Sequence, residues 1–166
     1  MLMKRHVAVA VLTALAGLGS ANLAVANATG SFAVSITIVG TCTIVTNPLA
    51  FGTVSTGTSG NANANATLSV TCPTGLPYNI GLQSVNAGGS GGGGTMKSGA
   101  LALAYNLYQN AGATTPWGNT VGTNTIAATG NAAAQNQTVY GQVLQAAANA
   151  ATAASYTDTV TVTVFY

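Results

Sequence analysis

The chain has 166 residues but only three Lys or Arg, one Asp or Glu, and one His. These are Lys4, Arg5, Lys97, Asp158 and His6, so only Lys97 and Asp158 would remain if the first 26 residues were cleaved off. This scarcity excludes metal sites built on His or clustered carboxylates, Ser-His-Asp and Cys-His nucleophiles, and paired-carboxylate hydrolysis. It also excludes nucleic-acid binding by phosphate neutralisation. We therefore expect no enzyme, no catalytic or metal site, no cofactor and no nucleic-acid partner.

The N-terminal residues 1–26 read as a signal peptide. Lys4 and Arg5 precede an apolar run, and small residues ending at Ala26 supply a cleavage site. Cleavage after Ala28 is the alternative, because Ala26-Asn27-Ala28 has the same small-x-small pattern. An uncleaved anchor is a further reading, but the run is short and rich in Ala and Gly for a bilayer span. We expect export through the periplasm to the cell surface and no integral membrane association after cleavage.

Export gives meaning to the two cysteines, Cys42 and Cys72. No third cysteine competes with them, and oxidising compartments favour disulfides. The sequence therefore predicts one disulfide, which would stabilise the chain by about 3–4 kcal/mol on the loop-entropy estimate. A redox pair is the alternative, and the absence of a Cys-x-x-Cys spacing disfavours it.

After the signal peptide, period-two alternation of apolar residues predicts short strands. The chain between them contains a Gly/Ser/Thr/Asn-rich loop at 55–64, a turn at 73–75, a glycine-rich loop at 86–94, and a turn at 115–118 that leads into a polar stretch. Residues 145–154 are Ala-rich and read as a short helix or a loop. Short strands with turn signals between them favour an all-β sandwich in one domain. The expected strands cover residues 31–39, 42–45, 49–54, 66–72, 78–83, 101–108, 138–144 and 156–166.

Two features do not fit a closed sandwich. The last strand runs to Tyr166 without a return strand, and the first strand, set off by Gly40, has the most apolar face in the chain. Strand addition between molecules would explain both features. The alternative is that residues 31–39 pair within their own domain, and the pattern alone does not decide between the two.

Several sequence blocks in order resemble the spore coat protein U domain family, which includes the pilins of archaic, Csu-type chaperone–usher pili. They span almost the whole chain after the signal peptide. The blocks are Leu49-Ala50-Phe51-Gly52, Val70-Thr71-Cys72, Pro77-Tyr78-Asn79-Ile80-Gly81-Leu82, Leu103-Ala104-Tyr105-Asn106-Leu107-Tyr108, Trp117-Gly118, Thr138-Val139-Tyr140-Gly141 and Tyr156-Thr157-Asp158-Thr159-Val160.

The resemblance implies an incomplete immunoglobulin-like β-sandwich lacking its last strand, at residues 41–166, preceded by an N-terminal donor strand at residues 27–40. It implies that Cys42 and Cys72 form the family's disulfide. The implied donor-strand residues are Phe32, Val34, Ile36 and Ile38. The implied edge of the acceptor groove is Val160, Val162, Val164 and Tyr166.

The resulting hypothesis is a structural subunit, the major shaft pilin of a chaperone–usher pilus for adhesion and biofilm formation. It would form a homopolymer by donor-strand complementation and would bind a periplasmic chaperone and an outer-membrane usher during assembly. Two alternatives stay open. One is a secreted surface or spore-coat protein, and the other is a monomeric module of the same fold that binds glycan or ice.

The remaining motifs have simple structural readings. Residues 89–94 satisfy Gly-x-Gly-x-x-Gly but lack the following helix and acidic residue of a dinucleotide site, so we expect a flexible loop. Lys97 is expected to be a solvated loop charge, and Asp158 to lie in a turn or at the start of a strand. Trp117 is expected to pack against the sandwich, and Tyr156 to fix a corner through its hydroxyl.

Overall fold

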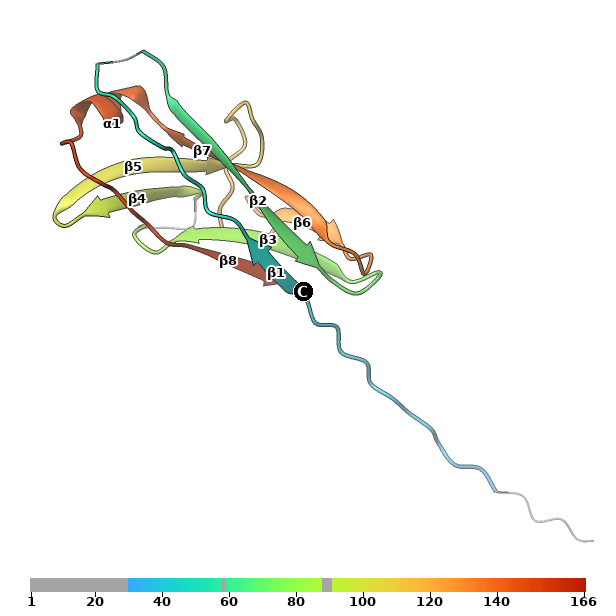
Figure 1. Ribbon diagram of the computed structural model, residues 1–166. Coiled ribbons are helices and arrows are strands. Elements are labelled where there is room, and N and C mark those ends of the chain that lie inside the picture. The colour runs from blue at the N-terminus through green and yellow to red at the C-terminus, as the bar shows by residue number, and fades with distance from the viewer. Residues whose placement is uncertain (1–29, 58, 88–90) are drawn as a thin grey trace, which may run out of the picture. The chain divides into compact units, whose positions relative to one another are not determined.

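The computed structural model describes residues 30–57, 59–87 and 91–166 of the chain (Figure 1). The chain divides into two units, residues 1–37 and residues 38–166, which are described separately. The predicted signal peptide lies outside the described residues. Within the described residues, no helix has the length and apolar character needed to cross a bilayer.

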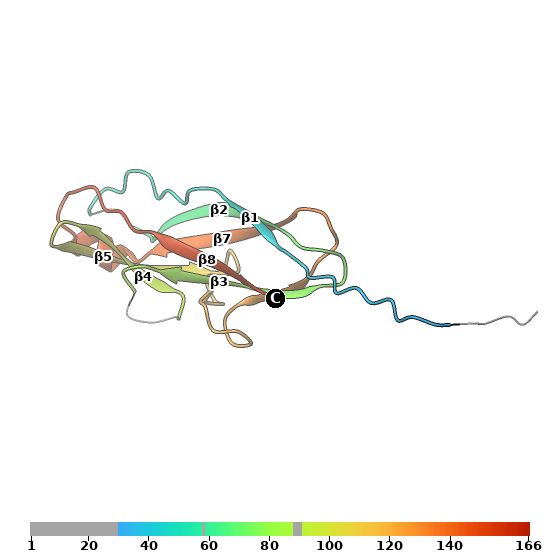
Figure 2. The same ribbon diagram turned by 90° about the horizontal axis from the view of Figure 1, so that it is seen from below.

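The described residues of the second unit form two antiparallel sheets and one short helix, α1 (Gln145–Ala150). Figure 2 shows β2 beside β7 and β3 beside β8. The fold is therefore all-β, as predicted. The five-stranded sheet has the order β1 (Thr43–Thr46), β2 (Ala62–Thr71), β7 (Gln135–Val143), β5 (Leu101–Tyr108) and β4 (Gly93–Ser98), and the three-stranded sheet has the order β6 (Ile126–Thr129), β3 (Pro77–Ser84) and β8 (Val160–Phe165).

The core lies between the sheets because alternate side chains of each strand point inward. Leu68 and Val70 enter it from β2, and Ile80 and Leu82 enter it from β3. Trp117, at the turn after β5, is completely buried, and its indole N–H donates to the Ile80 carbonyl oxygen at 2.9 Å. This packing confirms the expectation for Trp117 and the immunoglobulin-like sandwich.

The predicted disulfide is present between Cys42 and Cys72. Cys42 precedes Thr43 and Cys72 follows Thr71, which is the register partner of Thr43 in strands β1 and β2. The Cα atoms of the two cysteines are 4.4 Å apart. Cys72 is buried on the core face, as the alternation of β2 predicts.

Strand β4 corrects the expectation of a loop through residue 94. Gly94 pairs with Tyr105 in the β4–β5 ladder, and a Cβ atom at Gly94 would overlap the Tyr105 ring. Gly94 therefore permits close packing inside a strand, although the glycine-rich composition of residues 86–94 is typical of a loop. Lys97 is exposed, but it lies in this strand and not in a loop.

Three further boundaries differ from the prediction. Strand β6 pairs with the edge of β3 inside a stretch expected to be polar and irregular. Strand β2 begins at Ala62, because Ala and Asn alternate there between its two faces. Residues 49–54 form no strand, and Leu49 and Phe51 pack against the core without a ladder.

The N-terminal residues 31–39 are not a strand in this structure, contrary to the expectation. A strand requires a hydrogen-bonded neighbour, because alternation supplies a face but no partner for the backbone. The exposed fractions of Phe32, Val34, Ile36 and Ile38 are 87%, 83%, 84% and 84%. Four large apolar side chains are therefore solvated in this conformation.

Candidate functional site

A groove of about 1260 Å³ opens into the core along strand β8. Its floor includes Leu68, Leu82 and Leu107, which belong to the buried core cluster. Val160 and Val162 of β8 line one side, and residues 46–56 line another. The groove thus exposes the interior of the sandwich between the segment of residues 46–56 and strand β8.

The backbone of β8 is open on the side away from β3. The Val85 N–H donates to the Thr159 carbonyl at 2.8 Å, whereas the Leu82 N–H donates to Gly118 on the opposite side of β3. Leu82 is paired in register with Val162, and hydrogen-bonded pairs alternate along an antiparallel ladder. Val162 and its alternate neighbours therefore direct their N–H and C=O groups away from β3. Among the described residues, no strand pairs with this edge.

The opposite wall of the groove, at residues 47–56, forms no strand ladder in the described residues. The Asn47 N–H donates to the Thr67 carbonyl at 3.1 Å, and after this contact the chain leaves the edge of the five-stranded sheet. Leu49 and Phe51 then lie against Gly141, where a Cβ atom would meet both side chains within 3 Å. The Phe51 ring is edge-on to Tyr105, with 6.4 Å between the ring centroids. These two side chains hold the wall against the core without using its backbone groups.

A carboxylate anchors the start of β8 beside the groove. Asp158 accepts hydrogen bonds from the Ser84 and Tyr105 hydroxyls, the latter at 2.7 Å, and from the Asn86 amide at 2.8 Å. The Thr159 N–H adds a fourth bond at 2.8 Å. The single acidic residue of the sequence is thus occupied by structural contacts joining β3, β5 and β8.

Two pKa values are shifted in this cluster. Burial alone would raise the pKa of Asp158, but the donors Ser84, Tyr105, Thr159 and Asn86 together outweigh it, so the pKa lies below its ordinary value. The pKa of Tyr105 is raised, first by burial and then by its hydrogen bond to Asp158. A deprotonated Asp158 beside a protonated Tyr105 is a stable hydrogen-bonded pair and not a proton-transfer site at neutral pH.

The sequence matches the Spore Coat Protein U domain over residues 28–163. The chain belongs to this family. Among solved structures, it is similar to the CsuC-CsuE chaperone-tip adhesion subunit pre-assembly complex from archaic chaperone-usher Csu pili of Acinetobacter baumannii, with a TM-score of 0.57 and 23% identity. The similarity covers 78% of this chain but 40% of that chain, so it concerns the fold. A search of the curated proteins found no match.

In this Spore Coat Protein U domain, only two of the four residues expected at the edge of the acceptor groove line the groove. Val160 and Val162 line the groove, and Val164 packs against the core further along β8 without lining it. Tyr166 follows the end of the strand and is 59% exposed. The groove side of β8 therefore consists mainly of its first half.

Sequence reasoning missed several residues of the site. The contribution of Leu49 and Phe51 depends on Gly141, and no periodicity relates these residues. The Asp158 cluster joins residues that are 53 to 74 positions apart in sequence. Only the rarity of acidic residues could have singled out Asp158. The Tyr156 hydroxyl does fix a corner as expected, by donating to the Thr152 carbonyl at 2.8 Å.

Proposed function

We propose that this protein is the major shaft subunit of a chaperone–usher pilus and polymerises by donor-strand complementation. Residues 27–40 of one copy would occupy the groove beside β8 of the next copy. The observation that carries the proposal is an open apolar groove with an unpaired strand edge, in a chain that also has an exposed strand-like segment. The filament would serve surface attachment and biofilm formation.

The geometry of the two partners supports the proposal. Successive side chains on one face of a strand are about 7 Å apart. This spacing applies equally to Phe32, Val34, Ile36 and Ile38 in the donor and to the valines of β8. Residues 31–39, when fully extended, span about 30 Å, which exceeds the length of the six-residue β8. The donor is therefore long enough to pair along the whole open edge.

Burial supplies the driving force for this pairing. Transferring each exposed donor side chain into the groove contributes about 1.5–3 kcal/mol before the cost of ordering is subtracted. New backbone bonds to the open groups around Val162 add about 0.5–1.5 kcal/mol each. We propose that the burial of four such side chains, together with these backbone bonds, holds the joint without a covalent bond.

The open groove also explains the need for assembly partners. An unpaired edge beside exposed apolar residues is prone to aggregation. We propose that a periplasmic chaperone covers this edge before assembly and that an outer-membrane usher directs exchange for the donor segment. The fold similarity to a chaperone-bound pilus subunit supports the first step.

The donor side is tested by Ile36→Asp, with Ser35→Asp as the matched control. The control adds the same charge one position away, on the other face of the expected strand. Surface material is analysed by gel electrophoresis without heating, with boiled samples in parallel. We expect a heat-sensitive ladder of multimers from wild type and Ser35→Asp but only monomer from Ile36→Asp. A normal ladder from Ile36→Asp would contradict the proposal.

The acceptor side is tested separately by Val162→Asp, with Thr161→Asp as the control, because Thr161 belongs to the opposite parity of β8. Mixing each variant with wild type identifies which partner fails. Ile36→Asp should still accept a donor, and Val162→Asp should still donate. If the wild-type protein itself stays monomeric and binds ice or a glycan, the result would instead favour the alternative of a monomeric binding module. Filaments that form without a chaperone and usher would favour the coat-protein alternative.

A further inference from the structure

The outer face of the five-stranded sheet carries a second hollow, on the side of that sheet opposite the core. It has a volume of about 250 Å³ and is lined by residues of β2, β5, β7 and the loop after β5. Val139 and Val143 point into the core, so Tyr140 and Gln142, which alternate with them, lie on the outer face.

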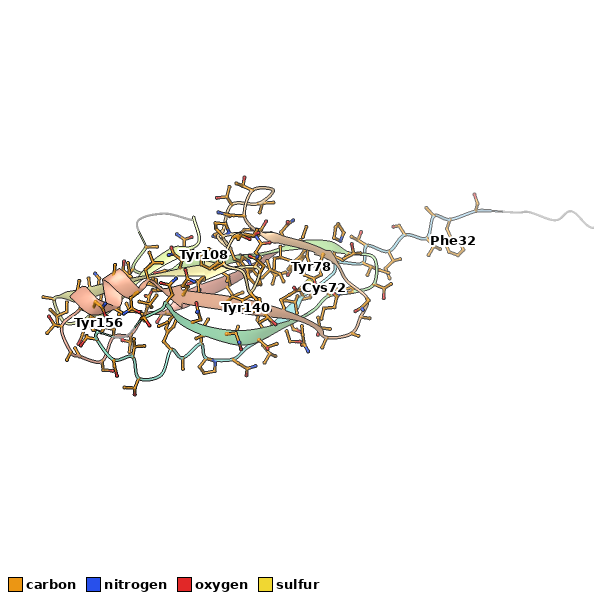
Figure 3. The ribbon with its side chains drawn as sticks, turned by 90° about the horizontal axis from the view of Figure 1, so that it is seen from above. Phe32, Cys72, Tyr78, Tyr108, Tyr140 and Tyr156 are labelled. Carbon is orange, nitrogen blue, oxygen red and sulfur yellow. A yellow bond between two sulfur atoms is a disulfide. The ribbon has the colours of Figure 1, made fainter. Side chains whose placement is uncertain are left out.

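Strand register brings two tyrosines and several amides together in this hollow. Tyr140 pairs with Tyr108 on one side and with Asn65 on the other. The next row pairs Gln142 with Asn63, and the Gln142 amide donates to the Asn63 side-chain oxygen at 3.1 Å. Directly opposed residues in an antiparallel sheet have Cβ atoms about 5 Å apart. Two aromatic rings and an amide pair are therefore neighbours on this face of the sheet. Figure 3 labels Tyr108 and Tyr140.

Two tyrosine hydroxyls of this surface are available, although the Asn63 amide is already bonded to Gln142 and to the Asn61 carbonyl. Tyr78, Tyr105 and Tyr156 use their hydroxyls within the protein, at 2.7 to 2.8 Å from their partners. In contrast, the hydroxyls of Tyr108 and Tyr140 make no hydrogen bond to any residue that the structure describes. Both rings are half-buried, so each is held by its neighbours while its polar end is free.

The surface carries no formal charge. The lining consists of Tyr, Asn, Gln, Ala and Gly. Lys97 is paired with Ala102, six residues along β5 from Tyr108 and hence about 20 Å away. Amide side chains offer both donors and acceptors without charge, which suits ligands whose hydroxyls also do both.

We propose that this hollow is a binding subsite for a neutral saccharide. A sugar ring has a C–H face that packs on aromatic rings and an edge of hydroxyls that pairs with amides. The volume is below the roughly 300–1,000 Å³ of pockets for drug-sized ligands, and it suits about one sugar ring. A protein partner fits less well, because standard interfaces bury about 800 Å² per partner around an apolar centre. Here, Ala is the largest aliphatic residue of the lining.

The subsite is independent of the proposed assembly, since its side chains lie on the other face of the sheet from the groove. If the chain also polymerises, each filament presents many copies, and weak single sites gain avidity. The two proposals therefore fail separately: Val162→Asp should leave sugar binding unchanged, and Tyr140→Ala should leave the multimer ladder unchanged.

Saturation-transfer difference NMR tests the site, because it observes the sugar and works for a monomer, a complex or a filament. The mature chain as isolated is mixed with cellotriose or maltotriose, and with trigalacturonate as a charged comparator. We expect transfer to at least one neutral trisaccharide and at least about tenfold weaker binding of trigalacturonate. Tyr140→Ala should weaken neutral binding by about tenfold or more. Thr138→Ala is the matched control on the same face of β7 and should bind like wild type.

If Tyr140→Ala fails to fold, Tyr140→Phe and Gln142→Ala replace it, since each removes polar groups while keeping most of the packing. Either should weaken binding by a few-fold. The proposal is overturned by no transfer to either neutral trisaccharide at millimolar concentration, or by equal transfer with wild type and the variants. It is also overturned if the Tyr140 variants change filament association without any sugar binding, because the face would then be an interface between copies.

Discussion

The Tyr105 hydroxyl donates a hydrogen bond to the Asp158 carboxylate across 2.7 Å, and the two residues are 53 positions apart in sequence. This contact joins β5 of the five-stranded sheet to a residue two positions before the start of β8 in the other sheet. β8 has a strand partner on only one side among the described residues. Its position therefore depends on β3, on this contact and on the two backbone hydrogen bonds between Thr157 and Lys97 of β4.

The substitution Asp158→Asn should destabilise the fold. It removes the charge that strengthens four hydrogen bonds and places an amide N–H group beside the Tyr105 and Ser84 hydroxyls. We expect a loss of about 1–3 kcal/mol in the free energy of unfolding. Urea denaturation followed by circular dichroism measures it, with Lys97→Ala as the control for an exposed charge. A midpoint equal to that of wild type would show that the cluster does not anchor β8.

At acidic pH, the pH dependence of the free energy of unfolding should come from the Asp158 carboxylate. The folded pKa of Asp158 lies below its ordinary value of 3.8, so on acidification the unfolded chain binds the proton first. The stabilisation is therefore present above about pH 4 and is lost as the pH falls through the folded pKa. With a single acidic side chain, the slope should not exceed about 1.4 kcal/mol per pH unit.

Unfolding midpoints at a series of pH values measure this acid limb. The Asp158→Asn variant should lose most of it and show nearly constant stability over the same range. An unchanged acid limb in the variant would assign the effect to the C-terminal carboxyl group instead.

Reduction of the Cys42–Cys72 bond should lower stability without permitting a different pairing. The disulfide closes a loop between residues 30 positions apart, and its loss should cost about 3–4 kcal/mol on the loop-entropy estimate. Thermal unfolding with and without dithiothreitol measures this cost. A double Cys→Ser variant that is insensitive to reductant is the control. Equal melting temperatures in both conditions would contradict the prediction.

Glycine at position 94 should be required by packing rather than by backbone conformation. An added Cβ would overlap the Tyr105 ring, which is 5% exposed and is held by Asp158. We therefore expect Gly94→Ala to cost about 1–3 kcal/mol. Gly93→Ala is the matched control, because its Cβ would approach the Asn106 side-chain oxygen at a tolerable 3.3 Å. Comparable stability of the two variants would exclude the packing explanation.

Local patterns in the sequence determined much of this protein. Alternation predicted strands in the regions of β2, β5 and β8, and the two cysteines, together with the expected export, predicted the disulfide. Ordered sequence blocks identified the family, and the near absence of charge was the ground for expecting no catalytic or metal site. Each of these inferences depends on neighbouring residues or on composition, and both can be taken directly from the amino-acid sequence.

The tertiary structure alone decided the rest. Strand β4 is not visible in the sequence because Gly94 is required by a ring eleven residues further on, at Tyr105. The groove exists because one edge of β8 and the segment holding Leu49 and Phe51 have no strand partner among the described residues. Pairing between distant segments is not encoded in either segment alone. Likewise, Tyr108 and Tyr140 share a surface only through the register of β5 and β7. Contacts between distant residues depend on how the sheets pair and pack, and this pairing is the information that periodicity does not contain.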